Sequence, residues 1–307
     1  MQETMMSSQD LMKLEDKYGA HNYHPLPVVL AKGEGVYVWD VEGKKYYDFL
    51  SAYSAVNQGH CHPRIIKALN EQAAQLTLTS RAFYNDMLGR YEKYVTEYFG
   101  YDKVLPMNTG VEAVETALKV CRKWSYEVKG IPTNQAKIIF VTGNFHGRTM
   151  AIISGSVDPQ STTGFGPFLP GIEIIPYNDL DALREALEDS NVAGFLVEPI
   201  QGEAGVYVPA DDYLKNAKAL CVKHNVLFIA DEVQTGIART GRLLASCGNC
   251  SCPNKDCSAT AEVKPDILIL GKALSGGVYP VSAVLANNSI MNVIVNISDS
   301  VFSSINF

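Results

Sequence analysis

The sequence has no surplus of basic residues. It carries 26 Lys and Arg against 33 Asp and Glu, which gives a formal net charge of −7 at pH 7 over 307 residues. No Lys/Arg-rich run stands out that could neutralise successive phosphates along a nucleic acid. These absences argue against a nucleic-acid-binding protein, and we expect no nucleic-acid partner.

Long apolar runs and targeting features are also missing. No apolar stretch approaches the roughly 20 residues that span a bilayer. The first ten residues are polar and no Arg precedes Arg64, so the start resembles neither a secretory signal nor an Arg-rich transit peptide. We therefore expect a cytoplasmic protein with no membrane partner, whose seven cysteines stay reduced.

From about residue 103 the sequence alternates short β-branched apolar runs with helical patterns. This alternation is typical of an α/β fold, in which helices flank both faces of a mostly parallel sheet. The predicted strands cover 103–107, 138–142, 173–176, 193–197, 226–230, 267–270 and 281–286. The predicted helices between them cover 111–124, 180–187 and 213–224.

The first 60 residues predict a small N-terminal lobe. Residues 36–39 and 45–49 flank the turn signal Glu42-Gly43, which favours an antiparallel hairpin. Helical patterns are expected at 10–17, 63–76 and 87–99. We expect a lobe at 1–60, a large domain at 61–294 and a separate tail at 295–307.

In such a sheet, ligands bind beyond the carboxyl ends of the strands. The stretch Asn108 to Ala113 begins a helix directly after a predicted strand. Backbone N–H groups at a helix start, together with the helix dipole, can seat a phosphate. The alternative is an ordinary tight turn. The G-x-G-x-x-G pattern of dinucleotide sites is absent after this strand.

Two further strand ends carry a carboxylate and a lysine. Asp231 closes the apolar run 226–230, and a buried Asp needs a cation such as a protonated pyridine nitrogen. Lys272 follows the run 267–270 in a Gly-rich turn, where lost hydration would lower its pKa and free the amine to form a Schiff base. The alternatives are a helix-capping Asp and a solvated surface Lys.

A fourth strand end is the stretch Gly143-Asn144-Phe145-His146-Gly147-Arg148-Thr149. Phe145 could stack on a flat ring, and Arg148 could hold a carboxylate in bidentate fashion. Core packing of Phe145 and a surface ion pair of Arg148 are the alternatives.

Together these segments resemble the class III, fold-type I aminotransferases that depend on pyridoxal 5'-phosphate (PLP), most closely the branch that acts on ornithine. The most specific stretches are residues 20–25, 49–60, 197–205, 231–236 and 271–277, within a likeness that runs from Tyr18 to Ile294. The resemblance implies PLP as cofactor and a homodimer in the intact family.

The resemblance also implies a role for each matching position. Lys272 would form the Schiff base and shuttle protons as the catalytic residue. The other cofactor-binding residues would be Asp231 at the pyridine nitrogen, Gly110 and Val111 at the phosphate, Phe145 on the ring and Gln234 at the phenolic oxygen. Tyr23, Tyr53, Arg148, Glu198 and Glu203 would bind substrate, with Glu203 pairing with an arginine that 2-oxoglutarate must displace.

The implied reaction transfers the δ-amino group of L-ornithine to PLP and then to 2-oxoglutarate. Its products would be glutamate 5-semialdehyde and glutamate, and its small-molecule partners are amino and oxo acids. Another class III ω-aminotransferase, acting on acetylornithine or 4-aminobutyrate, is one alternative. A non-catalytic fragment that binds PLP weakly, or that pairs with a full-length subunit, is the other.

The sequence departs from the family pattern in two places. An insertion at 246–262 holds Cys247, Cys250, Cys252 and Cys257, which could form a zinc site within one loop, a redox-responsive thiol cluster or a solvated insertion. We expect no metal. The residues after Val295 have no family counterpart, so a C-terminal truncation is expected, without the domain that bears the arginine partner of Glu203.

Overall fold

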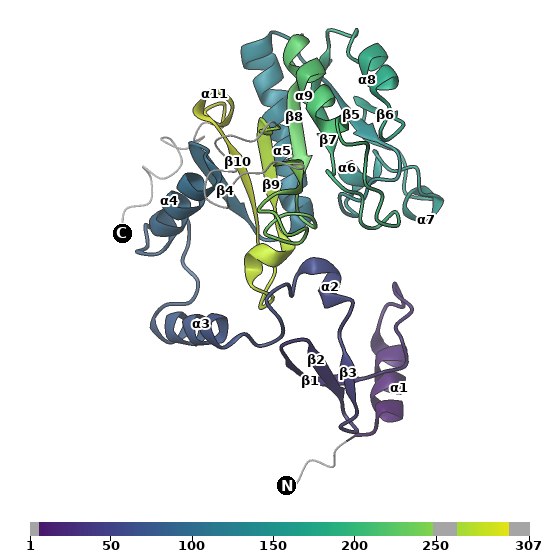
Figure 1. The fold of residues 1–307 in the computed structure, drawn as a ribbon, viewed down its shortest axis with the longest axis vertical. Coiled ribbons are helices and arrows are strands. Elements are labelled where there is room, and N and C mark those ends of the chain that lie inside the picture. Colours follow the sequence, from purple (N-terminus) through teal and green to yellow (C-terminus); the bar gives the residue numbers. More distant parts are fainter. Residues whose placement is uncertain (1–5, 248–262, 295–307) are drawn as a thin grey trace. The chain divides into compact units, whose positions relative to one another are not determined.

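The computed structural model describes residues 6–247 and 263–294 (Figure 1). It divides into two compact units, Met1–Thr79 with Gly276–Tyr279, and Ser80–Ser275 with Pro280–Phe307. The first unit includes helix α3 (Pro63–Gln75), which the sequence-based division assigned to the large domain. Each unit is described by itself.

The first unit contains a three-stranded antiparallel sheet. Its elements are α1 (Ser8–Tyr18), β1 (Leu30–Glu34), β2 (Tyr37–Asp40), β3 (Lys45–Tyr47), α2 (Ser51–Ser54) and α3. The predicted hairpin is confirmed, because β2 and β3 pair antiparallel with Val38 opposite Tyr46. The Asp40 carboxylate closes the turn, accepting hydrogen bonds from the Lys44 N–H and the Tyr46 hydroxyl, both at 2.7 Å. Strand β1 was not predicted.

The α2 segment is a left-handed turn. All four of its residues, Ser51–Ser54, have φ between 44° and 77°, which non-glycine residues adopt at a cost of about 1–2 kcal/mol each. The Asp48 carboxylate supports this turn by accepting the N–H groups of Leu50 at 3.0 Å and Ser51 at 2.8 Å. Its other oxygen lies 2.7 Å from His60 Nε2. Tyr53 therefore lies in a strained turn that hydrogen bonds to the Asp48 carboxylate hold in place.

The second unit is built on a seven-stranded sheet. Its strands are β4 (Lys103–Met107), β5 (Lys137–Val141), β6 (Ile172–Ile175), β7 (Val192–Val197), β8 (Leu227–Asp231), β9 (Ile267–Leu270) and β10 (Ser282–Ala286), in the order β4-β10-β9-β8-β7-β5-β6. Among the described strands of this sheet, β10 runs opposite to the other six, which confirms the mostly parallel sheet. Every predicted strand is present, with bounds that shift by no more than about one residue.

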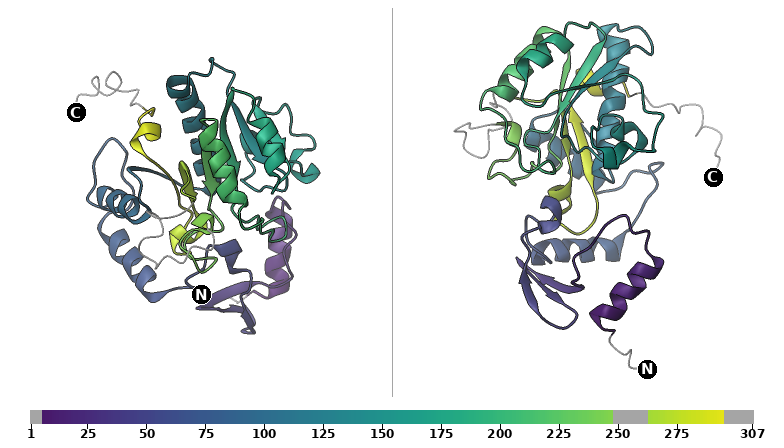
Figure 2. Two further views of the ribbon diagram at one scale, coloured as in Figure 1. Left: turned by 45° about the horizontal axis from the view of Figure 1, so that its top comes forward. Right: turned by 90° about the vertical axis from the view of Figure 1, so that its right-hand side faces the viewer.

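Helices cover both faces of this sheet (Figures 1 and 2). They are α4 (Leu88–Phe99), α5 (Gly110–Trp124) with its π-helical extension Ser125–Lys129, α6 (Met150–Ile153), α7 (Pro159–Thr162), α8 (Leu180–Ala186), α9 (Tyr213–Lys223) and α11 (Asn288–Met291), and two 3-10 turns lie at Ala245–Cys247 and Lys272–Ser275. None of the helices described is long and apolar enough to cross a bilayer.

The strand side chains alternate between two apolar cores. On β8, Ile229 packs in the core that contains α5, whereas Phe228 and Ala230 pack in the core that contains α8 and α9. A third cluster joins α4 to β9 and β10 through residues such as Val95 and Leu268. Because both faces are buried, the strands are continuous apolar runs rather than alternating ones.

Gly194 on β7 tests how tightly α5 packs on the sheet. A Cβ at this position would lie 2.6 Å from Cys121 Sγ and 3.1 Å from Ile229 Cδ1. We expect Gly194→Ala to destabilise the fold by about 1–3 kcal/mol, because buried neighbours must shift. Gly89→Ala is the control, since nothing lies within 4 Å of its Cβ, and a helical Ala stabilises by up to about 1 kcal/mol. Urea unfolding measures both, and equal midpoints would contradict the packing argument.

Candidate active site

The polar residues of interest follow the carboxyl ends of the parallel strands. In the second unit, the residues of interest lie on five of the loops that begin there: those after β4, β5, β7, β8 and β9. Parallel strands end at the same edge of a sheet, so these loops lie together at the edge where ligands bind in such folds. The reversed strand β10 instead begins at this edge.

Helix α5 presents its N-terminus at this edge. Thr109 Oγ1 accepts the Glu112 N–H, and the Glu112 carboxylate accepts the Thr109 N–H at 2.7 Å, which forms a capping box. The N–H groups of Gly110 and Val111 lie in the first turn, where the helix itself offers them no acceptor. A Cβ at Gly110 would lie 3.1 Å from Val233, so the glycine lets the loop after β8 approach the helix start. The first predicted junction therefore has the geometry of an anion seat.

Asp231 ends β8 as a buried carboxylate, only 4% exposed. Its Oδ1 accepts the Val233 N–H at 3.0 Å, and its Oδ2 lies 2.6 Å from His146 Nδ1. His146 lies within the predicted junction 143–149, where the sequence indicates no role for it. The available signal was its position directly after a strand end, on the same loop as Phe145.

Glu198 follows β7 and is also buried, at 5% exposed. Its Oε1 accepts the N–H of Phe145 at 2.8 Å, so this carboxylate holds the loop after β5. Burial raises the pKa of Glu198 to about 7, with the nearby His146 opposing the rise and the Asp231 charge adding to it. Glu198 thus touches the loop that carries two predicted site residues, Phe145 and Arg148.

Lys272 comes directly after β9 and Gly271, with φ of 41° at the start of a 3-10 turn. Burial lowers the pKa of Lys272, although the charges of three carboxylates, Glu203, Asp231 and Glu198, act to raise it. A lysine in this state releases its proton more readily than a solvated one, which suits it to attack a carbonyl carbon. The structure therefore brings Lys272 and Asp231 into one electrostatic environment.

Val233 links the start of helix α5 to the lysine-bearing strand. A Cβ at Gly271 would lie 3.0 Å from Val233 Cγ1, and a Cβ at Gly147 would lie 2.4 Å from Val111 Cγ2. These close approaches join four of the five loops. They explain why glycine recurs at the strand ends, where any side chain would push the loops apart.

Gln234 and Glu203 form a direct pair. Gln234 Nε2 donates to Glu203 Oε1 at 2.9 Å, and a Cβ at Gly202 would lie 1.5 Å from Gln234 Oε1. The pair therefore depends on a glycine at 202. This contact joins the loop after β7 to the loop after β8, whereas Glu198 joins the loop after β7 to the loop after β5.

Arg148 and the two predicted tyrosines occupy different parts of the structure. The Arg148 guanidinium lies 5.7 Å from the centre of the Phe145 ring, and both side chains are exposed at the same edge. Tyr23 and Tyr53 belong to the first unit and are 55% and 46% exposed. Their approach to Lys272 stays a prediction.

Glu232 shapes the loop beyond Asp231. This fully buried carboxylate accepts the Thr235 hydroxyl at 2.5 Å, the Ala245 N–H at 3.0 Å and the Ser246 N–H at 2.7 Å. Burial raises the pKa of Glu232, and these three donors act against the rise. These hydrogen bonds hold the two ends of the segment 232–246 together, directly after Asp231.

The cysteine-rich insertion is only partly within the structure. Cys247 is buried at 4% exposed, while Cys250, Cys252 and Cys257 lie outside the described residues. Among residues 6–247 and 263–294, no cluster of three His, Cys, Asp or Glu side chains could hold a metal ion. The zinc alternative stays untested.

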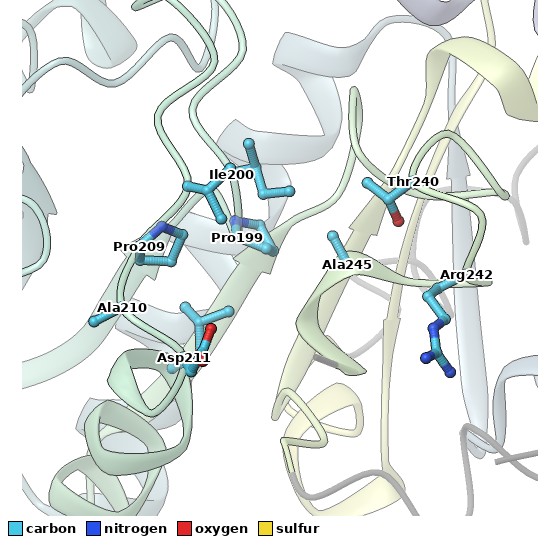
Figure 3. Close-up of a pocket in the computed structure, with 10 residues that line it drawn as sticks. Pro199, Ile200, Pro209, Ala210, Asp211, Thr240, Arg242 and Ala245 are labelled. Atoms are coloured by element: carbon cyan, nitrogen blue, oxygen red, sulfur yellow. The ribbon is translucent and has the colours of Figure 1, made fainter. Parts of the chain in front are cut away.

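A pocket lies beside the loop that follows Glu198 (Figure 3). It is lined by Pro199, Ile200, Val208, Pro209, Ala210, Asp211, Leu214, Thr240, Arg242 and Ala245, and none of the predicted site residues contributes to it. Asp211 and Arg242 lie on opposite sides of it in the view of Figure 3. The converging strand-end residues, rather than this pocket, form the candidate active site.

The comparisons with known proteins agree with this geometry. The family model described as Aminotransferase class-III matches residues 18–300. The chain belongs to this family. The match extends to residue 300, beyond Ile294, the predicted end of the likeness. In this family member, the loops described above carry the lysine and the carboxylates on which the resemblance was based.

Curated relatives of this class III aminotransferase are similar over most of its length. It is 66% identical over 284 residues to "Ornithine aminotransferase, mitochondrial" of Drosophila ananassae, which is 92% of this chain and 63% of the relative. The protein of the same name from Rattus norvegicus is 62% identical over 285 residues, 93% of this chain and 62% of the relative. The chain thus spans less than two-thirds of the length of these relatives.

Solved structures show the same fold. An ornithine aminotransferase from Toxoplasma gondii, described with partial occupancy of PLP at its active site, superposes with a TM-score of 0.90 at 52% identity, over 95% of this chain and 66% of that one. An acetylornithine aminotransferase from Elizabethkingia anophelis gives a TM-score of 0.81 at 60% identity, over 95% and 67%.

The residues at this edge fit PLP, the cofactor that family membership supports. Asp231 is a buried carboxylate that suits a protonated ring nitrogen. The start of α5 suits a phosphate, and Lys272 has the lowered pKa that a reactive amine needs.

Glu198 gives a pH-dependent prediction. Its pKa of about 7 lies above its ordinary value of 4.5, so between these pH values the folded chain keeps a proton that the unfolded chain has lost. The retained proton adds to the free energy of unfolding. This stabilisation is fully present below pH 4.5 and is lost as the pH rises through 7, by about 3 kcal/mol in all. Between pH 5 and pH 7.5, we expect the melting temperature of the Glu198→Gln variant to fall less than that of the unsubstituted chain. Thermal unfolding at each pH measures both.

The matched control is Glu188→Gln, which removes an exposed carboxylate. Its profile of melting temperature against pH should overlay that of the unsubstituted chain. If Glu198→Gln and Glu188→Gln both left the profile unchanged, the Glu198 carboxylate would not be buried as described.

Proposed function

We propose that the protein transfers the δ-amino group of L-ornithine to 2-oxoglutarate with PLP as cofactor. The observation that carries this proposal is Lys272, with its lowered pKa, beside the buried Asp231 at the carboxyl edge of the sheet. The names of the relatives at 66% and 62% identity supply the substrate. Because the chain spans less than two-thirds of their length, the activity is a proposal.

The chain's own residues divide the work of holding the cofactor. Asp231 would meet the ring nitrogen, Gly110 and Val111 the phosphate, Phe145 the ring face and Gln234 the phenolic oxygen. Bound there, PLP supplies an electron sink that makes a proton on the substrate carbon removable. Lys272 Nζ takes that proton and returns it to a neighbouring atom, acting as base and then as acid.

The substrate-binding residues are proposed on the same basis. Arg148 is exposed beside Phe145 and would pair with the α-carboxylate of ornithine, while Tyr23 would bind its α-amino group and Tyr53 would line the pocket. Glu198 holds the loop that carries Arg148, and Glu203 is held by Gln234. If Arg148 and Tyr23 bind the α-carboxylate and α-amino groups in this way, the δ-amine of ornithine is left to reach the cofactor.

Two further properties stay predictions. The homodimer follows from the family resemblance. The cytoplasmic location is not supported by the relatives, because those from Drosophila ananassae and Rattus norvegicus are named mitochondrial.

Covalent labelling tests the cofactor site. With PLP added and borohydride used to fix any imine, we expect the peptide that holds Lys272 to gain the cofactor mass, because its amine is half-buried and more easily deprotonated. Lys272→Ala should abolish the label. Lys119→Ala, which removes an exposed lysine of α5, should keep it. A label spread over surface lysines in all three proteins would refute the proposed cofactor site.

Donor choice tests the substrate. With 2-oxoglutarate as acceptor, ornithine should support faster transfer than acetylornithine or 4-aminobutyrate. Arg148→Gln should raise the KM for ornithine by about tenfold or more, because a bidentate ion pair is lost.

Arg184→Gln is the matched control, since this exposed arginine pairs with Asp181 on α8. Its KM should stay unchanged. Preference for acetylornithine, the substrate in the name of the Elizabethkingia anophelis relative, would replace the ornithine assignment and keep the aminotransferase class.

A further inference from the structure

The His146 ring is buried and makes one polar contact within residues 6–247 and 263–294. Its side chain is fully shielded from solvent, and Nδ1 lies 2.6 Å from Asp231 Oδ2. Nε2 is also buried and has no hydrogen-bond partner among the described residues. All the hydrogen bonding that this ring achieves in the described structure is therefore directed at Asp231.

A buried polar atom without a partner costs about 1–3 kcal/mol. Packing alone does not need this cost, since the ring's apolar neighbour is the edge-on Phe140, with ring centres 5.6 Å apart. A phenyl ring would fill the same space without an unsatisfied nitrogen. The histidine is therefore explained by the hydrogen bond that it makes and not by the volume that it fills.

The charges around His146 come from the ends of two strands. Asp231 on β8 and Glu198 after β7 both face it, and Lys272 and Glu203 lie in the same electrostatic environment. Burial favours the neutral ring, but the Asp231 hydrogen bond and the charges of Asp231 and Glu198 together raise the pKa of His146 above its ordinary value. In either protonation state, an acceptor carboxylate at Oδ2 requires the proton on Nδ1.

The second oxygen of Asp231 is also occupied, by the N–H of Val233 at 3.0 Å. Two donors, one on each oxygen, fix both the plane and the tilt of the carboxylate. The Val233 donor is part of the turn itself, whereas His146 reaches across from the loop after β5. Removing His146 would leave the Val233 N–H as the one described donor to Asp231, and Oδ2 would lose its donor.

We propose that His146 is a positioning residue, whose Nδ1–H holds the Asp231 carboxylate in the orientation that receives the cationic ring nitrogen of the cofactor. This inference rests on the proposed function. It adds a residue that acts through Asp231 and itself touches neither cofactor nor substrate.

The first test needs no cofactor. Nitrogen NMR of histidine side chains in the 307-residue chain, with its six histidines, should show His146 protonated at Nδ1 from pH 6 to pH 8. His146→Asn assigns the signal by its disappearance, and Asp231→Asn should shift it. The inference would be overturned by a His146 ring that is protonated only at Nε2, or by a His146 signal whose chemical shift is the same in the Asp231→Asn variant.

The second test compares two substitutions with opposite properties. His146→Asn keeps an N–H donor near the Nδ1 position but leaves a cavity, whereas His146→Phe keeps the ring volume and removes the donor. If the hydrogen bond matters, His146→Phe should weaken PLP binding by about tenfold or more, since a hydrogen bond to a charged group is worth roughly 1.5–3 kcal/mol. His146→Asn should stay within about threefold of the unsubstituted chain.

The reverse order, with Phe tolerated and Asn impaired, would mean that the ring serves packing alone and would overturn the inference. Failure of the unsubstituted chain to bind PLP would refute the proposed cofactor site. In that case the NMR result still decides whether His146 holds Asp231, so the two failures are distinguishable.

Discussion

Burying carboxylates at the ends of parallel strands is the constraint on which the site depends. Asp231 ends β8 and Glu198 follows the neighbouring β7, and each is no more than 5% exposed, where an uncompensated negative charge would be strongly unfavourable. The protein meets this constraint with donors from one loop: His146 serves Asp231, and the Phe145 N–H serves Glu198. The loop after β5 is therefore positioned by the same charges that it compensates.

Lys272 completes this balance from the next strand. Its positive charge faces three carboxylates, yet burial still lowers its pKa. The site consequently holds opposing charges in a region with little solvent, where each group depends on the protonation of the others. Glycines at 110, 147, 202 and 271 make this density possible, because each lies against a side chain of a neighbouring loop.

The sequence predicts the architecture well for a physical reason. A strand buried on both faces must be apolar along its whole length, so runs such as 267–270 are visible without a structure. The reversal of β10 was not foreseen, since an apolar run has the same appearance in either direction. The strand β1 was missed because its residues Leu30–Glu34 include Gly33 and two charged residues, and its burial is slight.

Candidate site residues could be named from the sequence where a charged residue directly follows or ends a buried strand, as at Asp231 and Lys272. His146 could not be named, because its function depends on a partner 85 residues away in the sequence. The pairing of Gln234 with Glu203 was missed for the same reason. Tyr23 and Tyr53 could be named only through resemblance, since nothing in their local sequence distinguishes them from other exposed tyrosines.

The reversed direction of β10 affects the dynamics of the lysine. Lys272 leaves β9 and the chain re-enters the sheet at Ser282, so both ends of its connection are hydrogen-bonded into adjacent strands at the same edge. A side chain on such a doubly anchored connection has less backbone freedom to lose than one on a free chain end. If Lys272 binds the cofactor as proposed, the folding of the sheet would already have met part of the entropic cost of holding it there.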